Sequence, residues 1–187
     1  MPTDSVGLPW LVAIDMQTIF ADQASDWATP DYGTASAGIR RLLPRFGDRV
    51  IYTRFIAPEH PAGAWVPYYQ DWPFALVPHD DPLYDVTSEF DTTGRAVVSR
   101  TTFGKWGDEL AAAMRGSTEM VLAGVSTDCC VLSTALGAAD AGIRVRVVSD
   151  ACAGVSPDDH ARALDAMAMY APLIEITTVD QVLADTV

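Results

Sequence analysis

The stretch from Met120 to Ala153, MVLAGVSTDCCVLSTALGAADAGIRVRVVSDACA, decides the fold. The apolar run from Met120 to Ala123 is short enough for a buried strand, and Gly124 is expected to end it. A helix rich in Ala and Leu is predicted from about Thr127 to Ala141, closed by the glycine that follows. The β-branched run from Ile143 to Val148 returns as a second strand. The stretch therefore predicts a β-α-β unit with two parallel strands.

Two cysteines, Cys129 and Cys130, stand in the predicted first turn of this helix. Unpaired N–H groups and the positive end of the helix dipole favour an anion there, so a cysteine in this turn is expected to have a lowered pKa. The turn is a candidate place for a nucleophile, although free cysteine also often only fills buried space. Adjacent helical residues point about 100° apart, so at most one thiol should face a crevice. The spacing does not say which.

Length and charge restrict the class of protein. The 187 residues fit one domain, over residues 1–187. With 25 acidic and 12 basic residues the net charge is −13, which argues against a nucleic-acid partner and for a soluble protein. No apolar run approaches the ~20 residues of a membrane span, and residues 1–7 lack the features of a signal peptide, so we expect a cytoplasmic protein. Because adjacent cysteines rarely bridge, Cys129, Cys130 and Cys152 are expected to be free thiols.

Strands and helices alternate along the rest of the chain. Further strands are predicted at Trp10–Ile14, Arg49–Thr53, Arg95–Arg100 and Leu173–Thr177. Further helices are predicted at about Thr34–Phe46, Ser156–Tyr170 and Asp180–Ala184, and the segment TTFGKWGDEL leads into another helix that ends at about Met114. This order predicts a three-layer α/β/α fold with a six-stranded, mostly parallel, Rossmann-like sheet and helices on both faces. The first strand and the strand before the cysteines should be neighbours at a topological switch point.

An acid and two cations fall at the carboxyl edge of the predicted sheet. Asp15 directly follows the first strand, at the edge where open α/β sheets bind ligands, although it could also be a plain turn or cap residue. Arg100 ends the third strand and Lys105 stands five residues later. Either cation could hold the carboxylate or stabilise negative charge, or it could be solvated surface.

Aromatic residues and prolines are dense from Arg54 to Asp81. This pattern fits the wall of a pocket, a lid or a subunit contact equally well. Because so much apolar surface is rarely left exposed on a monomer, we predict a homo-oligomer, a dimer or a tetramer, in which Trp65 or Tyr69 meets a neighbouring subunit. The candidate residues of the substrate pocket are Phe20, Trp27, Phe55, Trp65 and Trp106.

Two segments, LVAIDMQTIF near the start and GVSTDCCVLSTALGAADAGIRVRVVSDAC in the second half, resemble the isochorismatase-like cysteine hydrolases. That superfamily includes nicotinamidases and N-carbamoylsarcosine amidase. The similarity extends from Trp10 to Thr177. It implies a hydrolase that cleaves an amide-type C–N bond of a small molecule through a cysteine thioester.

The resemblance also assigns roles to individual residues. In the family an Asp after the first strand, a Lys after the third and a Cys at a helix start form a triad, which implies Asp15 and Cys130 as catalytic residues. Cys129 takes the variable position. The family also implies a cis peptide bond between Val125 and Ser126, which would expose backbone N–H groups near Ser126 and Cys130 as an oxyanion hole.

The sequence departs from the family where the lysine should be. In VVSRTTFGKW the matching position is Arg100, so we predict Arg100 as the ion-pair partner of Asp15, with Lys105 as the alternative cation. The Asp and His cluster that binds a metal in nicotinamidases is also missing, since TRFIAPEHP offers only His60 near that place. We therefore expect no metal, no cofactor and no nicotinamidase activity.

Three functions are compatible with these residues. In the first, Asp15 takes the proton of Cys130 and the thiolate attacks an amide carbonyl. In the second, the acid protonates a vinyl ether, as in some relatives, and the cysteine is dispensable. In the third, the chain is a scaffold that has lost activity, for which Arg100 is the strongest indication. The substrate itself is not named by the sequence, although the aromatic stretch suggests a flat or apolar acyl group.

Overall fold

A computed structural model describes residues 8–185, and the prediction about a signal peptide at residues 1–7 lies outside them. The centre of the fold is a six-stranded sheet in the order β3-β2-β1-β4-β5-β6, in which every neighbouring pair of strands is parallel. The predicted α/β fold is confirmed. The strands are β1 (Trp10–Ile14), β2 (Val50–Phe55), β3 (Ala96–Arg100), β4 (Glu119–Val125), β5 (Arg144–Ala153) and β6 (Ile174–Thr177).

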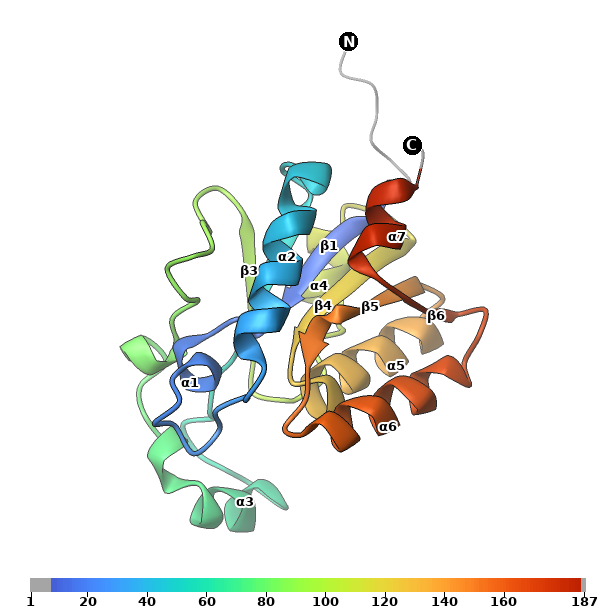
Figure 1. Cartoon of the computed structure of the whole chain (residues 1–187). Helices are drawn as coiled ribbons and strands as arrows, with labels where there is room; N and C mark the ends of the chain where they lie inside the picture. Colours follow the sequence, from blue (N-terminus) through green and yellow to red (C-terminus); the bar gives the residue numbers. More distant parts are fainter. Residues whose placement is uncertain (1–7, 186–187) are drawn as a thin grey trace.

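Helices cover both faces of the sheet (Figure 1). Successive side chains along β1 point to opposite faces of the sheet, which accounts for an apolar cluster on each face. Leu11 and Ala13 pack into one cluster, and Val12 and Ile14 pack into the other. The first cluster is covered by α2 (Tyr32–Phe46) and α7 (Val179–Ala184), and the second by α4 (Asp108–Ala113), α5 (Leu132–Asp140) and α6 (Pro157–Ala168). None of the described helices is long and apolar enough to cross a membrane.

Short elements form an excursion that lies at the opposite end of the molecule from α7 (Figure 1). They are α1 (Thr18–Ala21), α3 (Trp65–Asp71) and the 3₁₀ turns η1 (Pro73–Ala75) and η2 (Pro82–Tyr84). Gln17 holds the excursion to the sheet: its side-chain NH₂ donates to the carbonyls of Phe55 at 3.0 Å and Tyr84 at 2.8 Å, and its side-chain oxygen accepts from the Phe55 N–H at 2.8 Å.

The order of the strands places the switch point as predicted. β1 lies between β2 and β4, and Ile14 is opposite Gly124 in the parallel register. From β1 the chain first builds β2 and β3 on one side, and later β4, β5 and β6 on the other. Asp15 and the segment that follows β4 therefore emerge at the same edge of the sheet.

The prediction that Gly124 ends its strand is wrong, because β4 continues to Val125. The pairing between β4 and β5 shifts register between Leu122 and Gly124, and Gly124 has a φ of 125°. A Cβ at this position would lie 2.2 Å from the Ile14 carbonyl oxygen. Glycine here allows the strand to continue in close contact with β1.

Replacing Gly124 by alanine is expected to destabilise the protein by at least about 3 kcal/mol, because both the positive φ and the backbone contact with Ile14 exclude a Cβ. Urea unfolding measures the change. Gly33→Ala is the matched control, since no heavy atom lies within 4 Å of its added Cβ; it should be neutral or stabilise by up to about 1 kcal/mol. Equal unfolding midpoints for the two variants would contradict the packing described here.

Candidate active site

The two cysteines lie in a π-helical turn, η3 (Thr127–Val131), that precedes α5. The Val131 N–H donates to the Ser126 carbonyl at 3.1 Å, so the predicted single helix from Thr127 to Ala141 is divided in two. The peptide bond between Val125 and Ser126 is cis, as the family resemblance implied. Turns of the π type occur often at functional sites.

Side chains hold this turn against the start of α6. The Thr127 hydroxyl lies 2.8 Å from His160 Nδ1, and Asp128 Oδ1 accepts the Val155 N–H at 2.9 Å. Burial lowers the pKa of His160. The two residues directly before the cysteines are therefore tied to the segment from Val155 to His160.

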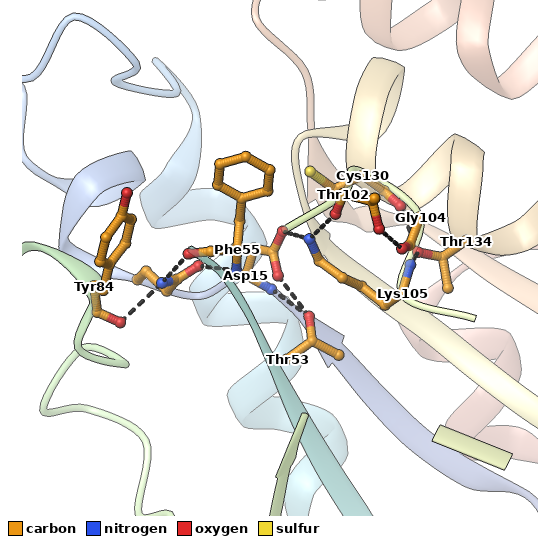
Figure 2. A network of polar contacts seen from close by, with 10 residues as sticks. Asp15, Thr53, Phe55, Tyr84, Thr102, Gly104, Lys105, Cys130 and Thr134 are labelled. Carbon is orange, nitrogen blue, oxygen red and sulfur yellow. Dashed lines mark hydrogen bonds and ion pairs between the residues drawn. The ribbon is translucent and has the colours of Figure 1, made fainter. Parts of the chain in front are cut away.

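Asp15 is the centre of a buried polar network (Figure 2). Its Oδ1 accepts a hydrogen bond from the Thr53 hydroxyl at 2.6 Å, and its backbone N–H donates to the same oxygen of Thr53 at 3.1 Å. Its Oδ2 lies 3.0 Å from Lys105 Nζ, and both side chains are fully buried. Besides this ion pair, Oδ2 has no hydrogen-bond partner within residues 8–185, so one of its lone pairs can accept a proton. Asp15 is thus a structured site residue rather than a plain turn residue.

Lys105 is fixed by the loop that carries it and by α5. Its Nζ donates to the Thr102 carbonyl at 2.8 Å and lies 4.9 Å from the centre of the Phe55 ring. Its backbone N–H donates to the Thr134 hydroxyl at 2.9 Å, and that hydroxyl in turn donates to the Cys130 carbonyl at 2.6 Å. One threonine therefore links the lysine loop to the helix of the cysteine.

The predicted ion pair between Arg100 and Asp15 is wrong, because Lys105 occupies that position. The Arg100 guanidinium lies against Gly107, where an added Cβ would be 2.8 Å from Nη1. It belongs to a shallow surface hollow with Asp108 and Glu109. Arg100, at the end of the strand, thus faces the start of α4, and Lys105, in the loop that follows, enters the site.

Cys130 lies beside the Asp15–Lys105 pair (Figure 2) and is only 3% exposed. Burial raises the pKa of its thiol well above the usual value; Lys105 lowers this pKa, and Asp15 raises it. The lowered pKa that we predicted from the helix start is therefore wrong, because tertiary burial outweighs the favourable end of the helix. The resting thiol is protonated, and a nucleophilic role needs a base to remove the proton.

A cavity of about 650 Å³ opens above these residues. Three of the predicted pocket residues, Phe20, Trp27 and Phe55, line it. Both cysteines also contribute to the lining, although only one was expected to; a π turn rotates successive side chains by a smaller angle than an α-helix does. The other lining residues are Asp26, Ala28, Thr29, Tyr68, Trp72, Phe103, Ser126 and Val155.

Two predicted pocket residues lie elsewhere. The Trp65 ring packs behind the cavity wall, with its centre 5.2 Å from those of Tyr68 and Phe103. Trp106 belongs to the apolar cluster under α5, where it contacts Gly137. Both predictions are wrong for the same reason: a neighbouring residue, Tyr68 or Lys105, points toward the site instead.

Residues 9–181 match the isochorismatase domain family. The chain belongs to the isochorismatase-like hydrolases. It is 29% identical to the nicotinamidase of Escherichia coli strain K12 over 158 residues, which cover 79% of this chain and 69% of that protein.

Solved structures of relatives share the fold. A cysteine hydrolase from Pseudomonas syringae pv. phaseolicola 1448A superposes with a TM-score of 0.82 at 21% identity, covering 98% of this chain and 97% of that one. N-carbamoylsarcosine amidase from Thermoplasma acidophilum superposes with a TM-score of 0.72 at 24% identity, covering 92% and 96% of the two chains. The isochorismatase-like fold and family that the two sequence segments indicated are confirmed.

Several residues of this isochorismatase-like site were not found by sequence reasoning. Thr53 and Thr134 had no visible signal, because their contacts with Asp15 and Lys105 join distant parts of the chain. Gln17 stands inside the LVAIDMQTIF segment, which was a signal that could have been used. Within residues 8–185, no group of three or more His, Cys, Asp or Glu side chains is placed to hold a metal ion.

Cys129, the cysteine next to Cys130 in this isochorismatase-like site, should react slowly with alkylating agents. Burial and, after it, the neighbouring Asp128 carboxylate, whose Oδ2 accepts from the thiol at 3.4 Å, together raise the pKa of Cys129 to about 11. Only the thiolate reacts, so the labelling rate of Cys129 should increase about tenfold per pH unit up to about pH 11. A free cysteine levels off above about pH 8.5.

Brief pulses of iodoacetamide, followed by fragmentation mass spectrometry to separate Cys129 from Cys130, measure this pH profile. Asp128→Asn keeps the side chain's size and removes its charge, so it should move the Cys129 profile to lower pH. A Cys129 profile that levels off near pH 8.5 in the unmodified protein would contradict the expected pKa.

Proposed function

We propose that this isochorismatase-family hydrolase cleaves an amide-type C–N bond of a small molecule through a thioester on Cys130. The observation that carries the proposal is the buried ion pair of Asp15 and Lys105 next to Cys130, at an aromatic cavity. A buried carboxylate beside a buried thiol is suited to move a proton to and from that thiol. The volume of the cavity, about 650 Å³, suits a small molecule.

In the first half of the reaction Asp15 Oδ2 takes the proton of the Cys130 thiol. The thiolate attacks the carbonyl carbon of the substrate, and backbone N–H groups near Ser126 and Cys130 stabilise the negative oxygen that forms. Asp15 then gives its proton to the leaving amine, and the C–N bond breaks. A thioester on Cys130 remains.

In the second half Asp15 accepts a proton from a water molecule, which attacks the thioester. The acid leaves, and the thiolate of Cys130 takes the proton back. Lys105 balances the charge of Asp15; both side chains are fully buried, and an unpaired carboxylate there would be costly. The same carboxylate thus serves as base and acid in both halves.

Ammonia release from a panel of primary amides, with hydroxylamine added in parallel, tests this function. Hydroxylamine intercepts a thioester, so an amide substrate should give the hydroxamate together with the free acid. Turnover without any hydroxamate would count against the covalent intermediate. Failure of every amide in the panel, with a folded protein, would count against amide hydrolysis.

Further properties remain predictions. We propose one domain over residues 1–187, a cytoplasmic homo-oligomer (dimer or tetramer) and no hydrolysis of nicotinamide. Tyr69 is buried and is not available for a subunit contact, whereas Trp65 is half-buried and packs against Tyr68 and Phe103 of its own chain. Sedimentation at micromolar concentration decides the oligomeric state independently of those aromatic residues.

A further inference from the structure

Six aromatic side chains form the walls of the active-site cavity: Phe20, Trp27, Phe55, Tyr68, Trp72 and Phe103. Trp27 lies in the middle of these walls. Its ring centre is 5.2 to 6.3 Å from those of Phe20, Phe55, Tyr68, Trp72 and Phe74. Rings that support one another in this way are already ordered before a ligand arrives, so little ordering cost remains for binding.

The charged groups at this cavity have one sign. Among residues 8–185, no Lys, Arg or His side chain lines it, whereas the Asp26 carboxylate does. A second carboxylate, Asp128, stands directly behind Cys129. Lys105 is close to Cys130, but its Nζ is already engaged by Asp15 and by the Thr102 carbonyl. The whole chain carries a net charge of −13, so the protein as a whole attracts cations.

We propose that the acyl end of the substrate carries a permanent cation, such as a quaternary ammonium group, that binds among these aromatic rings near Asp26. The substrate class is then an amide of a cationic acid. This assignment rests on the proposed amide hydrolysis for the reacting end of the molecule. The inference that a cationic group binds here depends only on the residues that line the cavity, and not on the reaction.

Three kinds of ligand behave differently in such a cavity. A cation gains from the negative faces of the aromatic rings other than Phe55, whose ring already has the Lys105 ammonium 4.9 Å from its centre, and it keeps a carboxylate within reach. A neutral apolar group of the same shape gains only from burial. A carboxylate loses its hydration and finds no cation to pair with in the described lining. The expected order of affinity is cation, neutral group, anion.

Calorimetric titration with three para-substituted benzamides tests the order: 4-(trimethylammonio)benzamide, 4-tert-butylbenzamide and 4-carboxybenzamide. The first two have nearly the same shape and differ in charge. We expect the ammonium compound to bind about tenfold more tightly than the tert-butyl compound, and about a hundredfold more tightly than the carboxylate. A tert-butyl or carboxylate compound that binds as tightly as the cation overturns the proposal.

Two variants locate the binding. Trp72→Leu keeps an apolar wall and removes a ring face, so the preference for the cation over the tert-butyl compound should fall to about threefold or less. Asp26→Asn should weaken the cation about two- to threefold and leave the tert-butyl compound unchanged. Asp22→Asn is the control, because it makes the same change of charge outside the lining and should leave the ratio unaltered. A cation preference that survives both Trp72→Leu and Asp26→Asn would place the binding elsewhere and overturn the assignment.

Binding is measured with Cys130→Ala, which cannot form the thioester, and hydrolysis is measured with the unmodified protein, so the two proposals are tested separately. Selective binding of the cation with no hydrolysis of any amide would support the cation site and count against amide hydrolysis. Hydrolysis with no preference for the cation would support amide hydrolysis and overturn the cation site.

Discussion

Replacing Cys130 by alanine is expected to lower amide hydrolysis by at least about a thousandfold, because it removes the thiol that lies beside the Asp15 carboxylate. The loss should appear in the turnover number, and the hydroxamate formed with hydroxylamine should disappear. Cys129→Ala is the matched control: it removes the adjacent thiol from the same turn and should keep activity within about tenfold, since Cys129 faces Asp128. Circular dichroism shows whether both variants are folded.

The same pair of variants separates the competing functions. If Cys130→Ala keeps turnover of a vinyl ether while Asp15→Asn loses it, the chemistry is protonation by the acid and the thioester route is excluded. If the unmodified protein turns over neither an amide nor a vinyl ether, the chain is a scaffold that has lost activity. The main reason for the scaffold hypothesis was that Arg100 stands where the family has a lysine. The structure weakens this reason, because Lys105 supplies a lysine partner for Asp15.

The architecture was predictable because it rests on local patterns. Buried strands of apolar residues alternate with helices, and this order alone favours a parallel sheet with helices on both faces. The switch point followed from the same order, and it brought Asp15 to the cysteine turn as expected. The family segments then singled out Cys130 from its neighbour, which spacing could not do.

The partner of Asp15 could not be read in the same way, since it depends on the separation of strands in space. Arg100 ends β3, and β3 is separated from β1 by the whole of β2. Neighbouring strands are about 4.8 Å apart, so the two strand ends are roughly 10 Å apart. The loop after β3 returns to α5, where a Cβ at Gly104 would lie 3.3 Å from the Ser133 carbonyl oxygen, and this close approach carries Lys105 to Asp15.

The pKa of Cys130 shows a second limit of sequence reasoning. Position at the start of a helix is a local property and favours the thiolate. Burial is a property of the finished fold, and here it is the largest cause of the raised pKa. The sequence therefore predicted which residue occupies the turn, but not whether it rests as a thiol or a thiolate.

Lys105→Met should lower amide hydrolysis by about a thousandfold or more, because it leaves the Asp15 carboxylate buried without a counter-ion next to Cys130. It should also lower the free energy of unfolding by about 3 to 5 kcal/mol, the usual result of removing one partner of a buried ion pair. Arg100→Ala is the matched control, because the Arg100 guanidinium lies against Gly107 at the surface. Its activity should stay within about threefold of the unmodified protein.

A double variant distinguishes lost chemistry from lost folding. Combining Lys105→Met with Asp15→Asn removes both charges together, so much of the unfolding free energy should return while hydrolysis stays absent. Urea unfolding gives the free energy of unfolding, and ammonia release gives the rate of hydrolysis. Both are measured on the unmodified protein, Lys105→Met, Arg100→Ala and the double variant. If Arg100→Ala abolishes hydrolysis while Lys105→Met preserves it, the roles of the two cations are reversed. The site would then have to close around Arg100 during the reaction, which the buried contacts of Lys105 with Asp15 and Thr102 oppose.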